Sequence, residues 1–378
     1  MTTHSIFAPS SAERAIPCPA SVTMEARYPE TEQTPESIEG EAAHWVVQQM
    51  LQGVTPSAGD PTPNGSFVTQ EMLEGADLMV EDVEIELEPF GMVPSSGAIE
   101  VPVHIPRAHA QCFGTPDYRN WLPTSPRPTL LLYDYKFGHR HVEVFENPQM
   151  IDYVSGCMSA TNLQDSQIDV VVKIVQPRSF HRDGPVRAWR FNGADIRAHI
   201  NRRAMAADLA LRPDPPAQSG PHCRDCKARH ACEAFTRSVY AAMDYAGKAV
   251  PMELSPAAMG VELVMIDEAI KRLEARKTGV QQQVESVMRR GAHVPHWSFE
   301  AGKGRERWKM PDAQVIALGQ AMGFDVAQPP KALTPKQAVD KGFPLHAMPG
   351  MTETPKTALT LVRDDGSKAR RVFGGGAA

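Results

Sequence analysis

Four cysteines constrain what this 378-residue chain can fold into more than any other feature of its sequence. Cys223, Cys226 and Cys232 stand together as Cys-x2-Cys-x5-Cys, whereas Cys18 precedes them by roughly 200 residues. Thiolates at this spacing favour an iron–sulfur cluster or zinc, both of which are bound by soft sulfur ligands. With Cys18 as fourth ligand, such a site closes a very long loop and stabilises the fold.

The cysteine spacing leaves open which metal would bind. An iron–sulfur cluster is the preferred interpretation, because the remote Cys18 ties the start of the chain to a much later segment. A zinc site made of three cysteines and either His222 or His230 is the alternative. Pro17 and Pro19 predict a rigid, extended backbone around Cys18.

Bulk composition excludes some classes of protein and leaves others open. The net charge of −6 offers no electrostatic case for nucleic-acid binding, so any such contact requires a local basic surface. No leader segment and no apolar run of roughly 20 residues is present, so we expect a soluble, cytoplasmic protein. Six cysteines are too few for a disulfide scaffold, and Cys112 and Cys157 have the apolar neighbours of buried, unreactive thiols.

Hydrophobic periodicity and turn residues predict helices interleaved with strands, which indicates an α/β core. A Pro-rich turn at 123–128 joins strands that we expect to form a small antiparallel sheet. The predicted helices are 38–51, 70–83, 148–159 and 194–211; the predicted strands are 98–105, 110–117, 129–136 and 168–175; residues 53–66 are predicted to be a loop.

The last third of the chain is predicted to be an appendage. A helix runs to about residue 246, residues 251–256 mark a boundary, and we divide the chain into domains 1–248 and 249–378. The appendage would hold a long charged helix at 262–290, a hairpin or extended pair at 294–310, short helices at 312–322 and 335–341, and a tail at 374–378. Within it, Lys303, Arg305, Arg307 and Lys309 would share one face of a strand, as a phosphate-contacting strip or as a solvated edge.

Two carboxylates and a lysine form the first part of a candidate catalytic group. Asp117 and Asp134 lie at or near the ends of successive predicted strands, so the turn between them can bring both side chains to one end of the sheet. Two carboxylates open to solvent can hold a divalent cation. Alternation along the strand turns Lys136 to the same face as Asp134, where an ammonium can orient water or offset negative charge.

Three further residues make this combination more informative than a lone Asp-x-Lys. His44 lies on a predicted helix, and its imidazole can complete a metal site that the carboxylates leave open. Gln149 and Tyr153 are four residues apart on one face of the next helix, where they can hold a strand backbone or stack on a base. Each residue alone is an ordinary surface side chain, but together they favour hydrolysis of phosphodiesters.

These residues, in this order, resemble the PD-(D/E)XK nucleases of the RecB type. The resemblance is to their iron–sulfur branch, which includes the AddB nuclease domain and the CRISPR-associated exonucleases, and to a phage and prophage group of this type. The elements that carry the nuclease resemblance are Gly40 with His44, Pro116-Asp117, Asp134-Tyr135-Lys136, Gln149 with Tyr153, and Cys18 with Cys223, Cys226 and Cys232. The likeness to the phage and prophage group comes from Ser11-Ala-Glu-Arg before Cys18-Pro-Ala-Ser and from the segment 297–308. Many relatives have Glu rather than Asp before x-Lys, and the family pattern includes both.

The resemblance implies a restriction-endonuclease-like core, a central mixed sheet flanked by helices, with an iron–sulfur staple. The mostly helical C-terminal appendage has no counterpart in the short CRISPR enzymes, so the resemblance does not imply its role. The resemblance also implies residue roles. His44, Asp117, Asp134 and the backbone carbonyl of Tyr135 would bind Mg²⁺ or Mn²⁺, and Asp117, Asp134 and Lys136 would be catalytic. Gln149 and Tyr153 would contact DNA, and the four cysteines would hold a 4Fe-4S cluster.

The expected function is therefore that of a metal-dependent DNA exonuclease, rather than an endonuclease, in phage recombination, replication or DNA-end processing. Two alternatives stay open: a catalytically idle DNA-binding or assembly protein on the same fold, and a zinc-stabilised regulator. An oligomer, a phage single-strand-binding or annealing protein as partner, and a location in the host cytoplasm are compatible with the leading interpretation.

Overall fold

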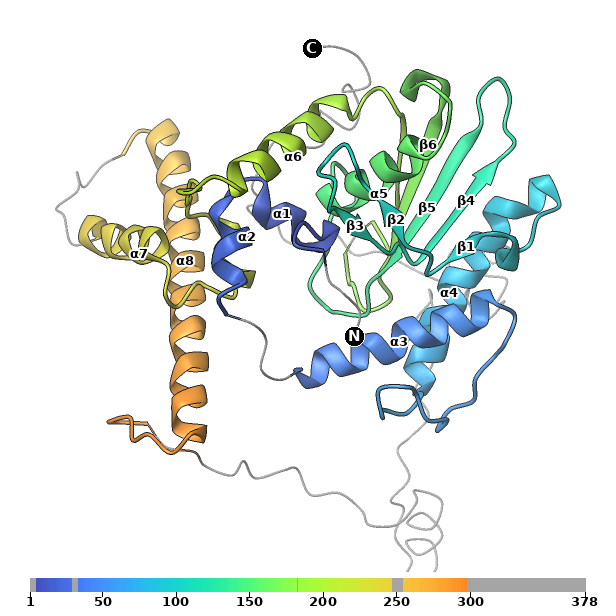
Figure 1. Cartoon of the computed structure of the whole chain (residues 1–378). Coiled ribbons are helices and arrows are strands. Elements are labelled where there is room, and N and C mark those ends of the chain that lie inside the picture. Colours follow the sequence, from blue (N-terminus) through green and yellow to red (C-terminus); the bar gives the residue numbers. More distant parts are fainter. Residues whose placement is uncertain (1–4, 29–32, 182, 247–253, 298, 300–378) are drawn as a thin grey trace, which may run out of the picture. The chain divides into compact units, whose positions relative to one another are not determined.

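The computed structural model describes residues 5–28, 33–181, 183–246, 254–297 and 299 of the chain (Figure 1). One compact unit contains the described residues up to His293, and nearly all of the second, Val294–Lys368, lies outside the described part. The hairpin expected at 294–310 therefore lies largely outside it, and the basic strip, the short helices at 312–322 and 335–341 and the tail lie wholly outside it. The domain boundary expected at 248 and 249 falls on residues that are not described and stays a prediction.

A five-stranded mixed sheet forms the centre of the first unit (Figure 1). The strand order is β1-β4-β5-β6-β7, with β5 and β6 parallel and the other neighbours antiparallel. The strands are β1 (Ala98–Ile99), β4 (Tyr118–Leu122), β5 (Thr129–Tyr135), β6 (Asp169–Val175) and β7 (Val186–Asn192), and a separate ribbon pairs β2 (Val103–His104) with β3 (Phe113–Gly114). The predicted α/β architecture is confirmed.

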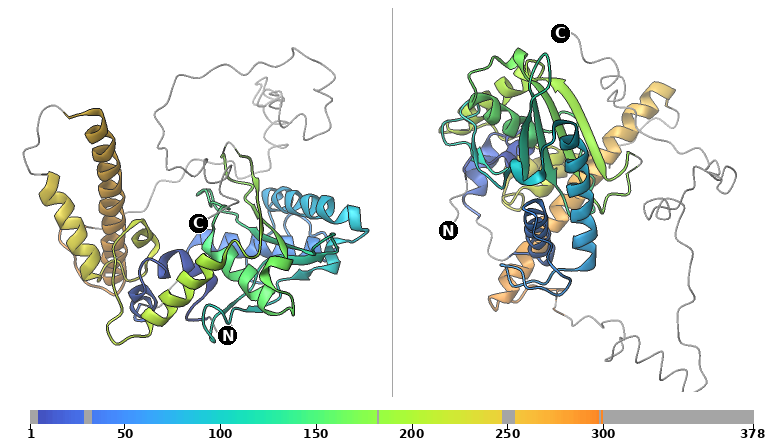
Figure 2. Two further views of the ribbon diagram at one scale, coloured as in Figure 1. Left: turned by 90° about the horizontal axis from the view of Figure 1, so that it is seen from above. Right: turned by 90° about the vertical axis from the view of Figure 1, so that its right-hand side faces the viewer.

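Helices cover both faces of this sheet (Figures 1 and 2). Side chains alternate along β5, so Leu131 and Tyr133 join the apolar cluster of α3 and α4, while Leu130 and Leu132 join that of α5 and α6. Every residue of β5 is consequently buried. The helices are α3 (Pro35–Leu51), α4 (Gln70–Leu87), α5 (Pro148–Ser159) and α6 (Arg197–Ala210).

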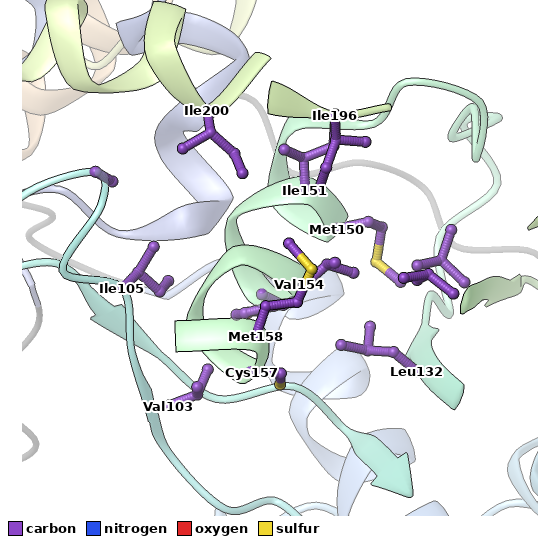
Figure 3. Close-up of a cluster of buried hydrophobic side chains, with 14 of the residues drawn as sticks. Val103, Ile105, Leu132, Met150, Ile151, Val154, Cys157, Met158, Ile196 and Ile200 are labelled. Carbon is purple, nitrogen blue, oxygen red and sulfur yellow. The ribbon is translucent and has the colours of Figure 1, made fainter. Parts of the chain in front are cut away.

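The cluster around α5 shows how the helix that carries Gln149 and Tyr153 is held. Figure 3 shows Met150, Val154 and Met158 of this helix directed into a group of buried apolar side chains from the sheet and from α6. The side chain of Asn147 accepts the backbone N–H groups of Gln149 and Met150, which fixes where the helix begins. Packing and capping together fix α5 so that the side chain of Gln149 reaches Asp134 at the end of β5.

The remaining helical segments lie near the chain start and around the cysteines. The longest of these, α8, packs against α7 and η5 through a small apolar cluster of Cys223, Phe235, Val239 and Ala275. These segments are η1 (Pro9–Ser11), α1 (Ala12–Ala15), α2 (Ala20–Glu25), η2 (Glu88–Phe90), η3 (Pro94–Ser96), η4 (Asp165–Gln167), η5 (Pro221–Asp225), α7 (Glu233–Ala246) and α8 (Pro256–Arg289). In the described residues, no helix combines the length and apolar character that crossing a bilayer demands.

Several predicted elements are confirmed, and three predictions about the strands and Cys18 are wrong. The helices predicted at 38–51, 70–83, 148–159 and 194–211 and the strands at 129–136 and 168–175 are present, with ends shifted by up to four residues. The predicted strand 98–105 is instead split between β1 and β2, because Glu100 has a left-handed φ of 51° and Pro102 interrupts pairing. In 110–117 only β3 is a strand, so Asp117 precedes β4 rather than ending a strand.

The backbone around Cys18 is helical rather than extended. Cys18 lies between α1 and α2, its N–H donates to the carbonyl of Arg14, and its carbonyl accepts from Ser21. The two prolines do not impose an extended backbone, because a φ near −65° suits the first turn of a helix as well as an extended chain. Pro19 has φ −53° and ψ −35° and leads directly into α2. The isolated thiols Cys112 and Cys157 are buried as predicted, and burial raises the pKa of Cys112 to about 12 and that of Cys157 to about 11.

A buried ion pair ties the chain start to α5 and α6, and its loss should destabilise the fold. Arg203 Nε lies 2.9 Å from Asp152 Oδ2, and Arg203 Nη2 donates to the carbonyl of Phe7 at 2.8 Å. Because both side chains are almost fully buried, Arg203→Met is expected to lower the free energy of unfolding by about 3–5 kcal/mol, measured by urea denaturation. The exposed neighbour provides the control: Arg202→Met should change it by less than about 0.5 kcal/mol, and equal effects would contradict the assignment.

Candidate active site

The antiparallel pairing of β4 and β5 brings Asp117 and Asp134 to one end of the sheet. Tyr118, the first residue of β4, lies opposite Tyr133 near the end of β5, so the residue before β4 meets the residues that follow Tyr133. The N–H of Tyr135 donates to Asp117 Oδ2 at 2.5 Å. Because the N–H and C=O of a strand residue point to the same side, the carbonyl of Tyr135 also points to the side of β5 on which β4 lies.

His44 reaches this carboxylate from α3. Its Nδ1 lies 3.0 Å from Asp117 Oδ1, and its ring meets that of Tyr135 edge to face, with centroids 5.6 Å apart. Burial lowers the pKa of His44, but the Asp117 charge and hydrogen bond outweigh it, so the net shift is upward. Burial acts to raise the pKa of Asp117, and His44, Lys136 and the Tyr135 N–H together bring it below its usual value. The pair is thus an imidazole held against an ionised carboxylate.

Glu100 completes this group and was not identified from the sequence. Its left-handed backbone follows β1, and its N–H donates to the carbonyl of Asp117 at 3.1 Å. One ligand atom each from His44, Glu100 and Asp117 lie within 4.8 Å of one another. Burial and the nearby Asp117 carboxylate raise the pKa of Glu100 to about 8. One feature of the sequence could have indicated Glu100: it is the single acidic residue in the otherwise mainly apolar segment 98–105.

A second set of contacts organises Asp134 and Lys136 beside that group. Lys136 Nζ lies 3.0 Å from Asp134 Oδ2, and burial, which lowers the pKa of Lys136, is outweighed by the charges of Asp134 and Asp117, so its net pKa is raised. Gln149 Nε2 donates to Asp134 Oδ1 at 3.0 Å, and Gln149 Oε1 accepts from Lys136 Nζ at 3.3 Å. Gln149 Nε2 also lies 3.3 Å from the hydroxyl of Tyr153. The amide of Gln149 therefore holds both ends of the Asp134–Lys136 pair.

All the residues expected at the catalytic group are thus brought together at this end of the sheet. Within the described residues, however, the group of three tightly spaced ligand atoms includes Glu100, whereas Asp134 is engaged by Lys136 and Gln149. The role of Asp134 as a metal ligand stays a prediction. The group opens into a cavity of about 510 Å³, lined by Ser37, Gly40, Glu41, His44, Trp45, Gln48, Glu100 and Asp117.

The donor set suits a divalent cation. The carboxylates of Asp117 and Glu100 each offer an oxygen within 4.8 Å of the other. Because the pKa of Glu100 is raised to about 8, it retains a proton at neutral pH that a cation can replace. Carboxylate oxygens are the ligands preferred by Mg²⁺ and Mn²⁺, and imidazole is accepted by the latter. The cavity leaves room beside His44 and Asp117 for a further ligand.

The second predicted site contains the cysteines, and it also combines residues from distant parts of the chain. Cys18 Sγ accepts the N–H of Gln218 at 3.4 Å, and Cys223 Sγ accepts that of Gly220 at 3.4 Å. Burial raises the pKa of the thiols of Cys18, Cys223 and Cys226, the last to about 12, and charge interactions link Cys18, Cys223 and Cys232. Buried thiols that accept backbone N–H groups suit the ligands of a metal or cluster. In the described residues, no three of the four sulfur atoms lie within 4.8 Å of one another.

Contacts outside the thiols hold the same segments together. The N–H of Ala20 donates to the carbonyl of Pro216, and the carboxylate of Glu25 accepts from both Arg14 and the N–H of Lys227. These bonds join α2 to the segment that contains the three later cysteines. The long loop that the cysteine spacing predicted is therefore closed in the structure.

Comparison with known proteins identifies the family. A family model described as "Protein of unknown function (DUF2800)" matches residues 4–367, nearly the whole chain. The chain belongs to the DUF2800 family. A solved structure described as "Crystal structure of SSO0001" matches with 11% sequence identity and a TM-score of 0.29, and the match covers 62% of this chain and 89% of that one. The DUF2800 match includes the candidate catalytic group, the four cysteines and α8.

The Glu100 carboxylate is expected to be a major determinant of metal affinity. Glu100→Gln removes one anionic oxygen from the three-residue group, so the Mn²⁺ dissociation constant should rise at least about tenfold in calorimetric titration. Glu41 provides a matched control. It lines the same cavity but its carboxylate binds Gln33, and Glu41→Gln should leave the dissociation constant within about twofold.

The same titration should depend on pH in a defined direction. His44 and Glu100 have raised pKa values, so bound protons persist to higher pH and must leave when the cation binds. Mn²⁺ affinity is therefore expected to increase as the pH rises through about 8, and the increase should be smaller in Glu100→Gln. Equal affinity at pH values below and above this range in the unaltered protein would show that Glu100 is not a ligand.

Proposed function

We propose that this chain is a divalent-metal-dependent DNA exonuclease with a restriction-endonuclease-like core. The observation that carries the proposal is the convergence of His44, Asp117, Asp134 and Lys136 at one end of a mixed sheet, on segments as far apart as α3 and β5. Metal ligands beside a charged lysine at a solvent-accessible cavity are the parts that phosphodiester hydrolysis requires.

The residues have separate tasks in this proposal. His44, Asp117, Glu100, Asp134 and the carbonyl of Tyr135 would hold the cation, which when bound neutralises phosphate charge and supplies an activated water. The ammonium of Lys136 would orient the attacking water and offset the negative charge that develops on the phosphate.

Gln149 and Tyr153 would hold the side chain of Lys136 in position. The amide of Gln149 accepts from Lys136 Nζ while it donates to Asp134, which keeps the ammonium at the cavity end of β5. Tyr153 is 5% exposed and its hydroxyl lies against Gln149, so its first task is to position that amide rather than to stack on an exposed base. Contact of either residue with DNA remains part of the proposal.

A 4Fe-4S cluster bound by Cys18, Cys223, Cys226 and Cys232 is the second part of the proposal. Its role would be structural, because the cysteines join α2 to the segment before α7 and so close the loop that contains the whole catalytic core. Zinc is the alternative occupant, and the two are distinguished by colour. An iron–sulfur protein is brown and absorbs near roughly 400 nm, whereas a zinc protein is colourless.

The proposal is tested with anaerobically purified full-length protein and two DNA substrates, one linear with labelled ends and one circular. We expect loss of label from the linear DNA with Mg²⁺ or Mn²⁺, no loss with EDTA, and an intact circle. Cleavage of the circle would replace the exonuclease assignment by an endonuclease one. DNA binding with no metal-dependent product would favour an idle binding or assembly protein instead.

A further inference from the structure

The helix α8 has two different faces. One face packs on the cysteine segment: Ala275 and Gly279 are buried, Arg276 Nη1 donates to the carbonyl of His230, and Gln282 accepts from Arg229. The opposite face carries apolar side chains that no packed element in the described residues covers. Six of them are between 37% and 50% exposed: Met259, Leu263, Ile266, Ile270, Leu273 and Val280.

These exposed residues follow a heptad pattern, with successive steps of four and three residues. We call them, together with the positions that continue the pattern, the heptad stripe: Met259, Leu263, Ile266, Ile270, Leu273, Lys277, Val280, Val284 and Val287. Eight of the nine positions are apolar, and the stripe runs about 42 Å along the helix, or four heptads. Such a repeat is the pattern that pairs helices in coiled coils, and an apolar stripe of this size marks an association surface.

We propose that the heptad stripe is the interface between two copies of this chain, with their α8 helices antiparallel. This inference does not depend on the nuclease proposal. A second copy presents the same repeat, so each apolar side chain of one helix meets holes of matching spacing in the other. The contact is isologous and closes as a dimer under two-fold symmetry.

The charges of α8 favour the antiparallel direction. Its first half, 256–270, carries three acidic residues and no basic one, whereas its second half, 271–289, carries five basic and two acidic residues. Antiparallel pairing therefore sets the acidic half of each copy against the basic half of the other, while parallel pairing sets like against like.

The single polar position of the stripe supports the same direction. In a parallel dimer in register, Lys277 would meet Lys277 of the second copy in the apolar seam. In an antiparallel dimer centred between residues 271 and 272, Lys277 lies across from Ile266 of the second copy and beside its Asp267. The same register sets Leu263 against Val280, and it overlaps nearly the whole helix.

Sedimentation equilibrium of the full-length protein, at several concentrations, tests the interface. The unaltered protein should have the mass of a dimer, and the double variant Ile266→Glu/Ile270→Glu should be monomeric because it places charges in the seam. The matched control is Val261→Glu/Met265→Glu. These two residues are at least as exposed as Ile266 and Ile270 and lie on the same helix outside the stripe, so this variant should stay dimeric.

A charge exchange tests the direction without adding charge to the apolar positions. Lys277→Glu is expected to weaken the dimer at least about tenfold by placing two acids side by side, and adding Asp267→Lys should restore most of the affinity. Circular dichroism confirms folding of each variant. A monomeric unaltered protein, a dimer that persists in Ile266→Glu/Ile270→Glu, or a failure of the exchange to restore binding would each overturn the proposal.

Discussion

Asp134→Asn should eliminate metal-dependent DNA cleavage, with a loss of roughly 1,000-fold or more in the rate of label release. Asp134 is 3% exposed, binds both Lys136 and Gln149, and lies at the end of β5 next to the His44, Glu100 and Asp117 group. Removing its charge leaves Lys136 without its closest anion and removes a carboxylate beside the His44, Glu100 and Asp117 group. Both the cation and the lysine would then be misplaced at the reacting phosphate.

Loss of activity must be separated from loss of the fold. Because Asp134→Asn leaves the nearby ammonium unpaired, the double variant Asp134→Asn/Lys136→Met removes the pair together and should unfold within about 2 kcal/mol of the unaltered protein. Asp169→Asn is the matched control. Asp169 begins β6, binds Arg127 and lies at the opposite end of the sheet, so its loss should not affect cleavage. Active double variants would reject the nuclease proposal.

Cys226→Ala should cause the largest loss of stability. If the four thiols hold one cluster, a variant that lacks one ligand loses the cluster and, with it, the link between Cys18 and the later cysteines. A loop of roughly 200 residues then opens, and loop entropy alone predicts a fall of about 5 kcal/mol in the free energy of unfolding. The absorption near roughly 400 nm should disappear with it. Anaerobic purification, visible absorption and iron and zinc analysis measure the cofactor, and urea denaturation measures stability.

A solitary cysteine provides the control for this effect. Cys157 is 4% exposed in the apolar cluster of Figure 3, so Cys157→Ala should retain the full cofactor content and lose only about 1 kcal/mol. Zinc in place of iron in the purified protein would refute the iron–sulfur assignment but keep the structural role of the thiols. Normal cofactor content in Cys226→Ala would exclude Cys226 as a ligand.

The sequence correctly predicted elements whose position is set by neighbouring residues in the chain. Asn147 and Pro148 mark the start of α5, and the β-branched run of β6 is apolar because helices cover both faces of the sheet. The strand β7 was not predicted, because it is at the edge of the sheet and mixes Arg187, Trp189 and Arg190 in a pattern without clear alternation. Local patterns therefore indicated the centre of the sheet better than its edge.

Some residues of the candidate site were likewise indicated by the sequence, and one was not. The order of Asp117, Asp134 and Lys136 along the chain pointed to one end of a sheet, because β4 and β5 are joined by a short turn and must be antiparallel neighbours. Glu100 lacked such a signal. Glu100 reaches Asp117 because the strand before it, β1, pairs with the first residues of β4. Glu100 itself is in the left-handed conformation, so the chain leaves the sheet at this residue.

The sequence alone determined that this chain has an α/β core, and it singled out all but one of the residues that meet at the end of β5, since periodicity and spacing are properties of the chain itself. Only the tertiary structure decided that Glu100 joins His44 and Asp117, that Gln149 holds both Asp134 and Lys136, and that the heptad stripe faces outward. The physical reason is that contacts between distant segments depend on strand register and helix packing, which no local pattern specifies.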